Sequence, residues 1–247
     1  MSETIGYRQK LYQKYFSTQV AQQTQNLDLQ IPAEIKQLHA DLNHILPDNK
    51  NSRILDIGCG YGNLLLYLQQ QGYTHLEGID LSPEQVATAH SIGLKNVQQA
   101  DAFSYLQQLA PNTTYDLICM FDVIEHLHKT ELLQLLELIR SRLSEKGRAI
   151  FRTPNMDAPF TSIYAFGDFT HETLLNSRSA TQLMRSAGFQ TVNVVPSPIV
   201  GQSRLKTFWQ NCLFIGISYL VKIVLFATAR SSQGVLLTPN MIIVAQR

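Results

Sequence analysis

A short glycine-rich segment between an apolar run and a helical pattern constrains this chain more than any other feature. Residues 54–65 read ILDIGCGYGNLL, so the run ends in Asp56 and is followed by Gly58, Gly60 and Gly62. Glycine tolerates positive φ and close approach of a ligand to the backbone, because it has no β-carbon. The pattern predicts a sharp strand-to-helix turn that binds a ligand with its main chain. The plainer alternative is the same turn without a ligand.

The residues around the glycines indicate which ligands this turn excludes. A phosphate-binding loop ends in Gly-Lys-Ser/Thr and a dinucleotide-binding turn has G-x-G-x-x-G, whereas this segment has G-x-G-x-G and no lysine. The carboxylate of Asp56 would also repel a phosphate. A cationic adenosyl compound suits this charge better.

The order of the other segments predicts an α/β protein. Short apolar runs alternate with helical patterns, which is typical of a parallel sheet covered on both faces. Helices are expected from the capping sequence at Ser82, from Thr130, and over residues 177–187 before Gly188. Leu132, Leu136, Ile139 and Leu143 would form the apolar face of the helix that Thr130 opens. Strands are predicted at residues 53–57, 75–80, 96–101, 115–122, 147–153, 190–196 and 241–246.

We expect one domain, because 247 residues with 45% apolar content fill one core of ordinary size and no long linker interrupts them. Its parts are two helices within residues 1–50, a ligand-binding core at 51–195, an apolar helical insertion at 196–240 and a last strand at 241–247.

The glycine segment resembles motif I of the class I S-adenosylmethionine-dependent methyltransferases. The resemblance implies a doubly wound, seven-stranded, mostly parallel sheet whose last strand is antiparallel. It also implies S-adenosyl-L-methionine as the cofactor. By this resemblance, the residues expected around the cofactor are Asp56, Gly58, Cys59, Gly60 and Gly62 on the methionine side, Asp80 and Leu81 at the ribose, Asp101 and Ala102 at the adenine, and Phe121 and Val123 along its border. Helix capping is the alternative role for Asp80 and for Asp101.

The end of the fourth predicted strand carries the candidate catalytic groups. Residues 122–127 read DVIEHL, which resembles the corresponding motif of small-molecule O-methyltransferases. His126 is the candidate general base, since histidine titrates near neutral pH, and Glu125 and the distant His171 would assist it. Bracing of the loop is the alternative role for Glu125 and His126.

The segment 122–126 together with His171 is also similar to the acid-x-x-Glu-His plus distant His arrangement of magnesium-dependent small-RNA 2′-O-methyltransferases. This chain has Asp122 where that pattern has Glu, and two imidazoles suit Mg²⁺ poorly. We therefore predict no metal site, and a divalent ion is the less favoured alternative.

Composition excludes several other functions. A net charge of +1 without a dense basic cluster argues against nucleic-acid binding. Cys59, Cys119 and Cys212 are odd in number and lack C-x-x-C spacing, so neither a disulfide framework nor a zinc site is indicated. The first ten residues do not have the pattern of a secretory signal. We expect a cytoplasmic location.

The segment 207–229 is apolar over a helical length. Gln210, Asn211 and Lys222 interrupt it, and a membrane span would separate the last strand from its sheet, so spanning is rejected. Three interpretations stay open: a helix that caps the core or the active site, a dimer face, or an interfacial helix that gives peripheral access to lipid-linked substrates.

Together these features predict a methyltransferase that acts on a hydroxyl of a small molecule, with a sugar of a surface glycan or its lipid-linked precursor preferred. Methylation of a quinone precursor is the enzymatic alternative. A non-catalytic partner subunit with this fold is the other alternative, but such a subunit has no need of the glycines and acids.

Overall fold

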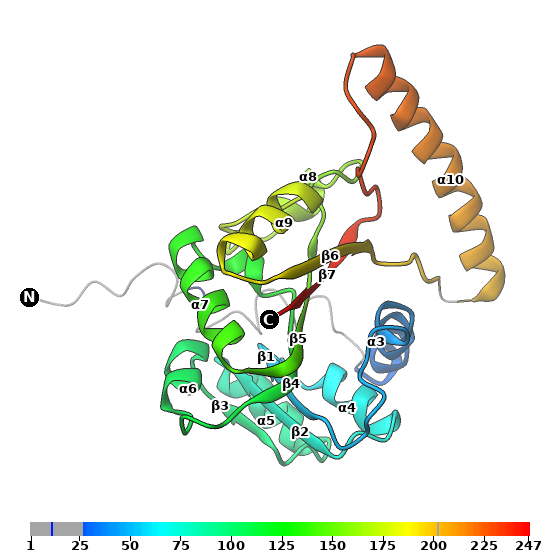
Figure 1. Cartoon of the computed structure of the whole chain (residues 1–247). Coiled ribbons are helices and arrows are strands. Elements are labelled where there is room, and N and C mark those ends of the chain that lie inside the picture. Colours follow the sequence, from blue (N-terminus) through cyan, green and yellow to red (C-terminus); the bar gives the residue numbers. More distant parts are fainter. Residues whose placement is uncertain (1–10, 12–26, 202) are drawn as a thin grey trace, which may run out of the picture.

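The computed structural model describes residues 11, 27–201 and 203–247, which build a seven-stranded sheet with helices on both faces (Figure 1). The strand order is β3-β2-β1-β4-β5-β7-β6, and β7 is antiparallel to both of its neighbours. The predicted doubly wound sheet with an antiparallel last strand is confirmed. The strands are β1 (Arg53–Ile57), β2 (His75–Asp80), β3 (Val97–Gln99), β4 (Tyr115–Phe121), β5 (Leu143–Pro154), β6 (Thr191–Pro196) and β7 (Asn240–Gln246).

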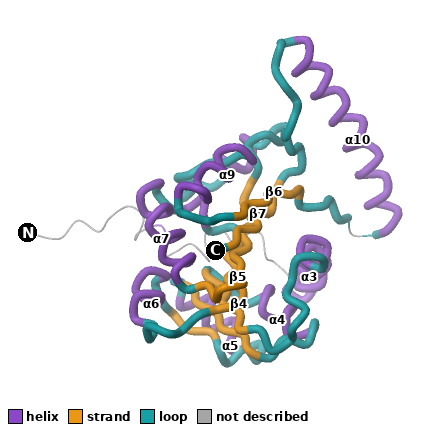
Figure 2. Tube along the Cα trace, viewed as in Figure 1, coloured by secondary structure: helices purple, strands orange, loops and turns teal. Residues whose placement is uncertain are grey.

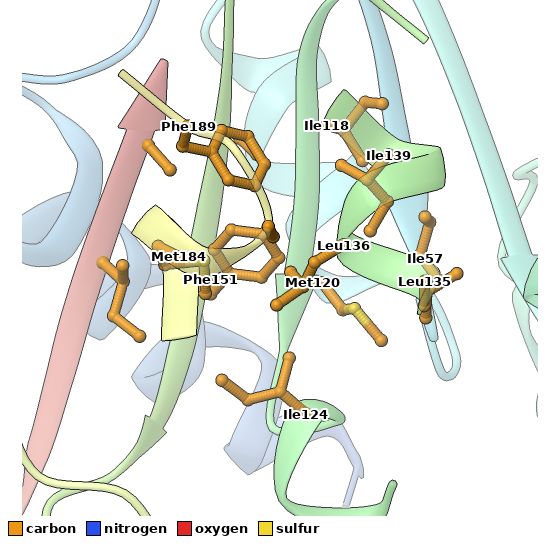
Figure 3. Packing of buried hydrophobic residues seen from close by; sticks show 14 of the residues in the cluster. Ile57, Ile118, Met120, Ile124, Leu135, Leu136, Ile139, Phe151, Met184 and Phe189 are labelled. Atoms are coloured by element: carbon orange, nitrogen blue, oxygen red, sulfur yellow. The ribbon is translucent and has the colours of Figure 1, made fainter. Parts of the chain in front are cut away.

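Each face of the sheet packs on its own set of helices. One core cluster joins the sheet to α6 (Ala102–Gln108), α7 (Lys129–Ser141) and α9 (Ser177–Ser186), as Figure 3 shows for part of it. The second cluster joins it to α3 (Leu27–Leu42), α4 (Asn63–Gln70) and α5 (Pro83–Ser91). The central strands are therefore buried on both sides, which explains their nearly continuous apolar runs.

Local helix signals place most boundaries correctly. The hydroxyl of Ser82 accepts a hydrogen bond from the Gln85 amide at 3.4 Å, and Pro83 is the first residue of α5. Gly188 has φ +87° just beyond α9, as the sequence predicts.

Three expected boundaries are wrong. The helix assigned to Thr130 begins at Lys129, because the His128 amide donates to the Glu131 carboxylate at 2.9 Å and so fixes the helix start one residue earlier. The helix also ends at Ser141, so Leu143 belongs to β5 instead of the apolar helix face. β5 is longer than predicted, since it pairs with both β4 and β7.

The amino-terminal and insertion segments differ in how they contact the sheet. Of the two helices predicted before residue 50, the second is α3, which contains Pro32, and the first lies outside the described residues. A short helix, α8 (Ser162–Ala165), precedes α9 within the predicted core, and the predicted insertion at 196–240 forms α10 (Arg204–Ala227) between β6 and β7. Figure 2 shows α10 projecting from the body of the protein. None of its residues is buried. A core-capping role for segment 207–229 is therefore wrong.

Candidate active site

The glycine turn lies where β1 meets α4, at the carboxyl end of the parallel strands. The amides of Gly58 and Cys59 both donate to the carbonyl of Ile79, at 2.8 and 3.0 Å, so the turn is fixed to the end of β2. Gly58 has φ +70°, and a β-carbon there would lie 2.4 Å from a methyl carbon of Val123. Only glycine fits this position without a shift of Val123. Gly60 and Gly62 also have positive φ.

Asp80, at the end of β2, holds the turn from below. One carboxylate oxygen accepts from the Gly60 amide and the other from the Ser82 amide, both at 2.8 Å. Burial raises the pKa of Asp80, while the backbone donors favour its ionised form. This carboxylate therefore stabilises both the glycine turn and the start of α5. Leu81, the next residue, is half exposed.

Asp56 is a buried carboxylate near the end of β1. Only 2% of the residue is exposed, and the charges that act on its side chain are those of Asp80 and Arg152. Burial raises the pKa of Asp56 well above its usual range, and the nearby charge of Asp80 raises it further. An acid left in this state suits a ligand that brings positive charge or hydrogen-bond donors. The site thus fits a sulfonium- and ammonium-bearing adenosyl cofactor.

The other predicted cofactor residues are spread along the same edge of the sheet. Asp101 is exposed and caps α6, where its carboxylate accepts from the amide of Ser104 at 3.0 Å, and Ala102 is the first residue of that helix. The helix-capping alternative for Asp101 is thus present in the structure. The side chain of Cys59 is buried, so this residue can present only its backbone to a ligand.

The helix α3 covers the glycine turn from the outside. The Tyr61 hydroxyl contacts both carboxylate oxygens of Glu34 at 3.0 to 3.1 Å, and the Asn63 amide also donates to that carboxylate. Burial raises the pKa of Glu34, and the hydrogen bond from Tyr61 opposes this effect. No motif in the sequence includes Glu34, so its contact with the glycine turn was not predicted.

A second group of polar side chains lies just beyond β4. The 3₁₀ turn Ile124–His126 buries Glu125 and His126, and the rings of His126 and His171 have centroids 4.8 Å apart. One ligand atom from each of Glu125, His126 and His171 lies within 4.8 Å of the others. The structure therefore brings Glu125, His126 and His171 together, although His171 follows His126 by 45 residues in the sequence.

His126 is held by a short polar chain that the sequence did not reveal. Its Nδ1 lies 2.8 Å from the Thr170 hydroxyl, and that hydroxyl donates to Asp168 at 2.6 Å. With the hydroxyl proton directed to Asp168, the Nδ1–H of His126 donates to Thr170 and the lone pair lies on Nε2. Burial lowers the pKa of His126, and the neighbouring His171 lowers it further. The imidazole is neutral at neutral pH.

Glu125 positions the segment that carries His171. Its carbonyl accepts from the amides of Glu172 and Thr173 at 2.7 and 2.9 Å, and its carboxylate accepts from the Thr153 hydroxyl at 3.1 Å. Burial raises the pKa of Glu125 to about 8, and the charge of Asp122 contributes to this rise. The bracing alternative for Glu125 is thus present in the structure.

Asp122 does not join the carboxylate–imidazole group. It is ion-paired with Arg152 of β5, whose Nε lies 3.0 Å from one carboxylate oxygen, and it has φ +55°. Arg152 also approaches the Asp41 carboxylate of α3 at 3.6 Å and the ring of Phe121, whose centroid is 5.0 Å from the guanidinium carbon. Arg152 directly follows the apolar run 149–151 of β5, and no sequence motif predicted this network.

The remaining donor set is one carboxylate and two imidazoles. Such a set suits zinc or a late transition metal better than Mg²⁺, which prefers oxygen ligands. Our expectation that the site works without a metal stays a prediction.

Comparison with known proteins gives one family for the chain. Residues 28–194 match the model of a methyltransferase domain family. The chain is 33% identical over 89 residues to ajmaline N-methyltransferase of Rauvolfia serpentina, covering 34% of this chain and 31% of that protein. It is 30% identical over 109 residues to a ubiquinone biosynthesis O-methyltransferase of Rickettsia bellii, covering 44% of each. The chain thus spans well under half the length of these curated relatives.

The fold is shared with solved structures. A structure described as a SAM-dependent methyltransferase from Archaeoglobus fulgidus superimposes with a TM-score of 0.64 and 20% identity, over 98% of this chain and 100% of that one.

Proposed function

Since the chain belongs to the methyltransferase domain family, we propose that it transfers the methyl group of S-adenosylmethionine to a hydroxyl group of a small molecule. The observation that carries this proposal is the pairing of two sites at one edge of the sheet. The first is the buried carboxyl group of Asp56 beside the glycine turn, and the second is the neutral His126 beyond the neighbouring strand β4.

The residues that would hold the cofactor are those that shape the turn. Gly58, Gly60 and Gly62 have positive φ and no β-carbon, so the backbone there allows close approach of a ligand, and Asp56 and Asp80 lie at the ends of the two strands beside this turn. Leu81, Asp101 and Ala102 follow the ends of the next two strands, and Phe121 and Val123 close the opposite side. When bound, the cofactor supplies an electrophilic methyl group on a positively charged sulfur.

His126 would remove the proton of the acceptor hydroxyl. Methyl transfer depends mostly on in-line positioning, but an alcohol or phenol also has to lose its proton as it attacks. The chain from Asp168 through Thr170 fixes the tautomer in which Nε2 is basic. His171 lies beside this ring, and Glu125 anchors the segment that carries His171.

According to their names, one of the relatives above methylates nitrogen and the other oxygen. Our proposal for the acceptor atom therefore depends on the site of this chain. A buried neutral imidazole favours a hydroxyl that needs deprotonation. For the acceptor we keep the sugar hydroxyl of a surface glycan or its lipid-linked precursor as the first candidate and a quinone precursor as the second. The free thiols Cys59, Cys119 and Cys212 are compatible with the reducing cytoplasm that we propose as its location.

The test has two steps. Titration calorimetry with S-adenosylmethionine and its demethylated product should show binding that Asp56→Asn and Asp80→Ala weaken. Transfer of labelled methyl is then measured on matched hydroxyl and amine forms of the same phenol, quinol, sugar and lipid-linked scaffolds.

We expect transfer to the hydroxyl forms and its loss in His126→Asn. Absence of binding by the folded protein would contradict the cofactor, and transfer to amines alone would contradict the acceptor. Cofactor binding without any transfer would support the non-catalytic alternative.

A further inference from the structure

The helix α10 exposes more large apolar side chains than any other element of the described residues. It has 24 residues, so it is about 36 Å long, and it is long and apolar enough to cross a membrane. Its second turn is held by the segment that follows β6, since the Asn211 side-chain amide donates to the Ile199 carbonyl at 3.3 Å. The rest extends away (Figures 1 and 2). Its exposed large apolar residues are Leu205, Phe208, Trp209, Leu213, Ile215, Ile217, Tyr219, Leu220, Ile223, Val224 and Phe226.

These apolar residues cover a wide face of the helix. At 3.6 residues per turn they spread over about 200° of its circumference. The polar strip opposite them is made by Arg204, Asn211, Ser218 and Lys222, which recur at intervals of seven, seven and four. Val221 lies on this side of the helix as well, and Lys206 lies within the apolar arc. A helix with an apolar face of this width can bury that face in the boundary between headgroups and acyl chains of a bilayer.

The path of the chain excludes a full membrane span. After α10 the chain returns through residues 228–239 to β7, which is paired on both sides inside the sheet. A span would pull this return segment, with Arg230, Ser231 and Gln233, through hydrocarbon in a non-helical form whose backbone groups would lack partners. The helix can therefore enter and leave a membrane only from one side.

The distribution of charge selects the partner. Residues 173–247 contain seven Arg or Lys and no Asp or Glu, although the whole chain has a net charge of only +1. An anionic lipid surface complements this segment. A symmetric dimer through α10 would place Arg204, Lys206 and Lys222 of two copies near one another, with no acid on either helix to pair with them.

A second apolar patch lies on the segment around α8. Phe160, Ile163, Tyr164, Phe166 and Phe169 are each at least 67% exposed.

This patch is joined to the return segment of α10 through one residue. The Thr161 hydroxyl donates to the Asn155 carbonyl at 2.8 Å, and the Asn155 amide donates to the carbonyls of Leu236 and Thr238 at 2.8 and 2.9 Å. Figure 1 shows α8 at the same upper edge of the body from which that segment leads to α10.

The patch also adjoins the candidate active site. The Nδ1 atom of His171 lies 3.1 Å from the carbonyl of Ala165, the last residue of α8. A membrane that contacts α8 would therefore lie next to the His126–His171 pair.

We propose that α10 and the α8 patch dock the protein on the surface of an anionic bilayer. The docked enzyme takes its acceptor from that surface: an amphiphile with its tail in the bilayer and its hydroxyl in the headgroup layer. The second statement rests on the proposed function, whereas the docking does not.

The test is flotation of the full chain with vesicles of phosphatidylcholine alone or with a quarter of phosphatidylglycerol. We expect binding to the anionic vesicles, weakened by salt, and a loss of about tenfold or more in Leu220→Glu and Ile223→Glu. Ser218→Glu is the matched control, because it adds the same charge on the polar strip of the same helix, and it should lose much less. Phe166→Ser should weaken binding independently.

Sedimentation velocity and calorimetry with the cofactor accompany each variant. A wild-type chain that ignores vesicles would overturn the proposal, and so would equal losses in Leu220→Glu and Ser218→Glu. If the wild-type chain forms a dimer but does not bind vesicles, and Leu220→Glu makes it monomeric, then α10 is a contact between two copies and the proposal is wrong. Calorimetry shows whether each variant still binds the cofactor. A variant that binds the cofactor but not the vesicles has lost docking alone, so a failure of docking can be told apart from a failure of the proposed function.

Discussion

Val123 closes over Gly58: a methyl carbon of Val123 lies 2.4 Å from the place that a β-carbon on Gly58 would take. The two residues follow neighbouring parallel strands, β1 and β4. The contact therefore links the glycine turn, which we expect to hold the cofactor, to the segment that carries His126. Both sites depend on the same close approach of two strand ends.

Gly58→Ala should destabilise the protein by about 1–3 kcal/mol and weaken cofactor binding, because the new methyl group displaces Val123. Gly72→Ala is the control, since Gly72 also has positive φ, at +87°, but nothing lies within 4 Å of its would-be β-carbon. Urea unfolding and calorimetry measure the two effects. Equal losses in both variants would mean that backbone strain alone is responsible.

Asp80→Ala should weaken binding of S-adenosylmethionine by about 1.5–3 kcal/mol, the usual worth of a hydrogen bond to a charged group. The mutation also releases the amides of Gly60 and Ser82, so the free energy of unfolding has to be measured beside the binding. Unchanged affinity in the folded variant would contradict the ribose assignment. Asp101→Ala is informative in the same assay: a stability loss of about 1 kcal/mol without a binding loss would mean that this residue only caps α6.

His126→Asn should lower kcat by about 10²-fold or more and leave cofactor affinity nearly unchanged, as expected when a general base is lost. A base acts in its unprotonated form, and the pKa of His126 lies below its ordinary value of 6.5. The rate of the wild-type enzyme should therefore rise with pH below 6.5 and be level above it. If His126→Asn keeps the full rate or the wild-type pH profile, His126 is not the general base and only braces the loop.

Glu125→Gln should stabilise the protein above neutral pH. The pKa of Glu125 is raised from 4.5 to about 8 in the folded state, so the folded protein binds more protons than the unfolded chain between these values and loses stability as pH rises. Glutamine does not titrate. The gain in unfolding free energy should be absent below about pH 4 and grow to the order of 2 kcal/mol or more by pH 8.

Loss of activity in Glu125→Gln that tracks removal of a metal by a chelator would instead make the carboxylate a ligand. Unfolding curves at several pH values and assays with and without chelator separate the two outcomes.

The sequence alone determined the sheet and its edge. Alternating apolar runs and helices predict a parallel sheet, and three glycines after a strand predict where its ligand site lies, because both features arise from short-range backbone geometry. The grouping of Glu125, His126 and His171 came from resemblance to a motif, and the structure brings these side chains together.

Tertiary structure decided which side chains meet. The ion pair between Asp122 and Arg152 and the polar chain from Asp168 through Thr170 join residues that lie on different elements or loops. No periodicity encodes such contacts, since they depend on how whole strands and loops are placed. The same holds for α10: its composition fits a buried helix and a membrane-bound one equally, and only its position outside the packed body, with the following strand returning into the sheet, separates them.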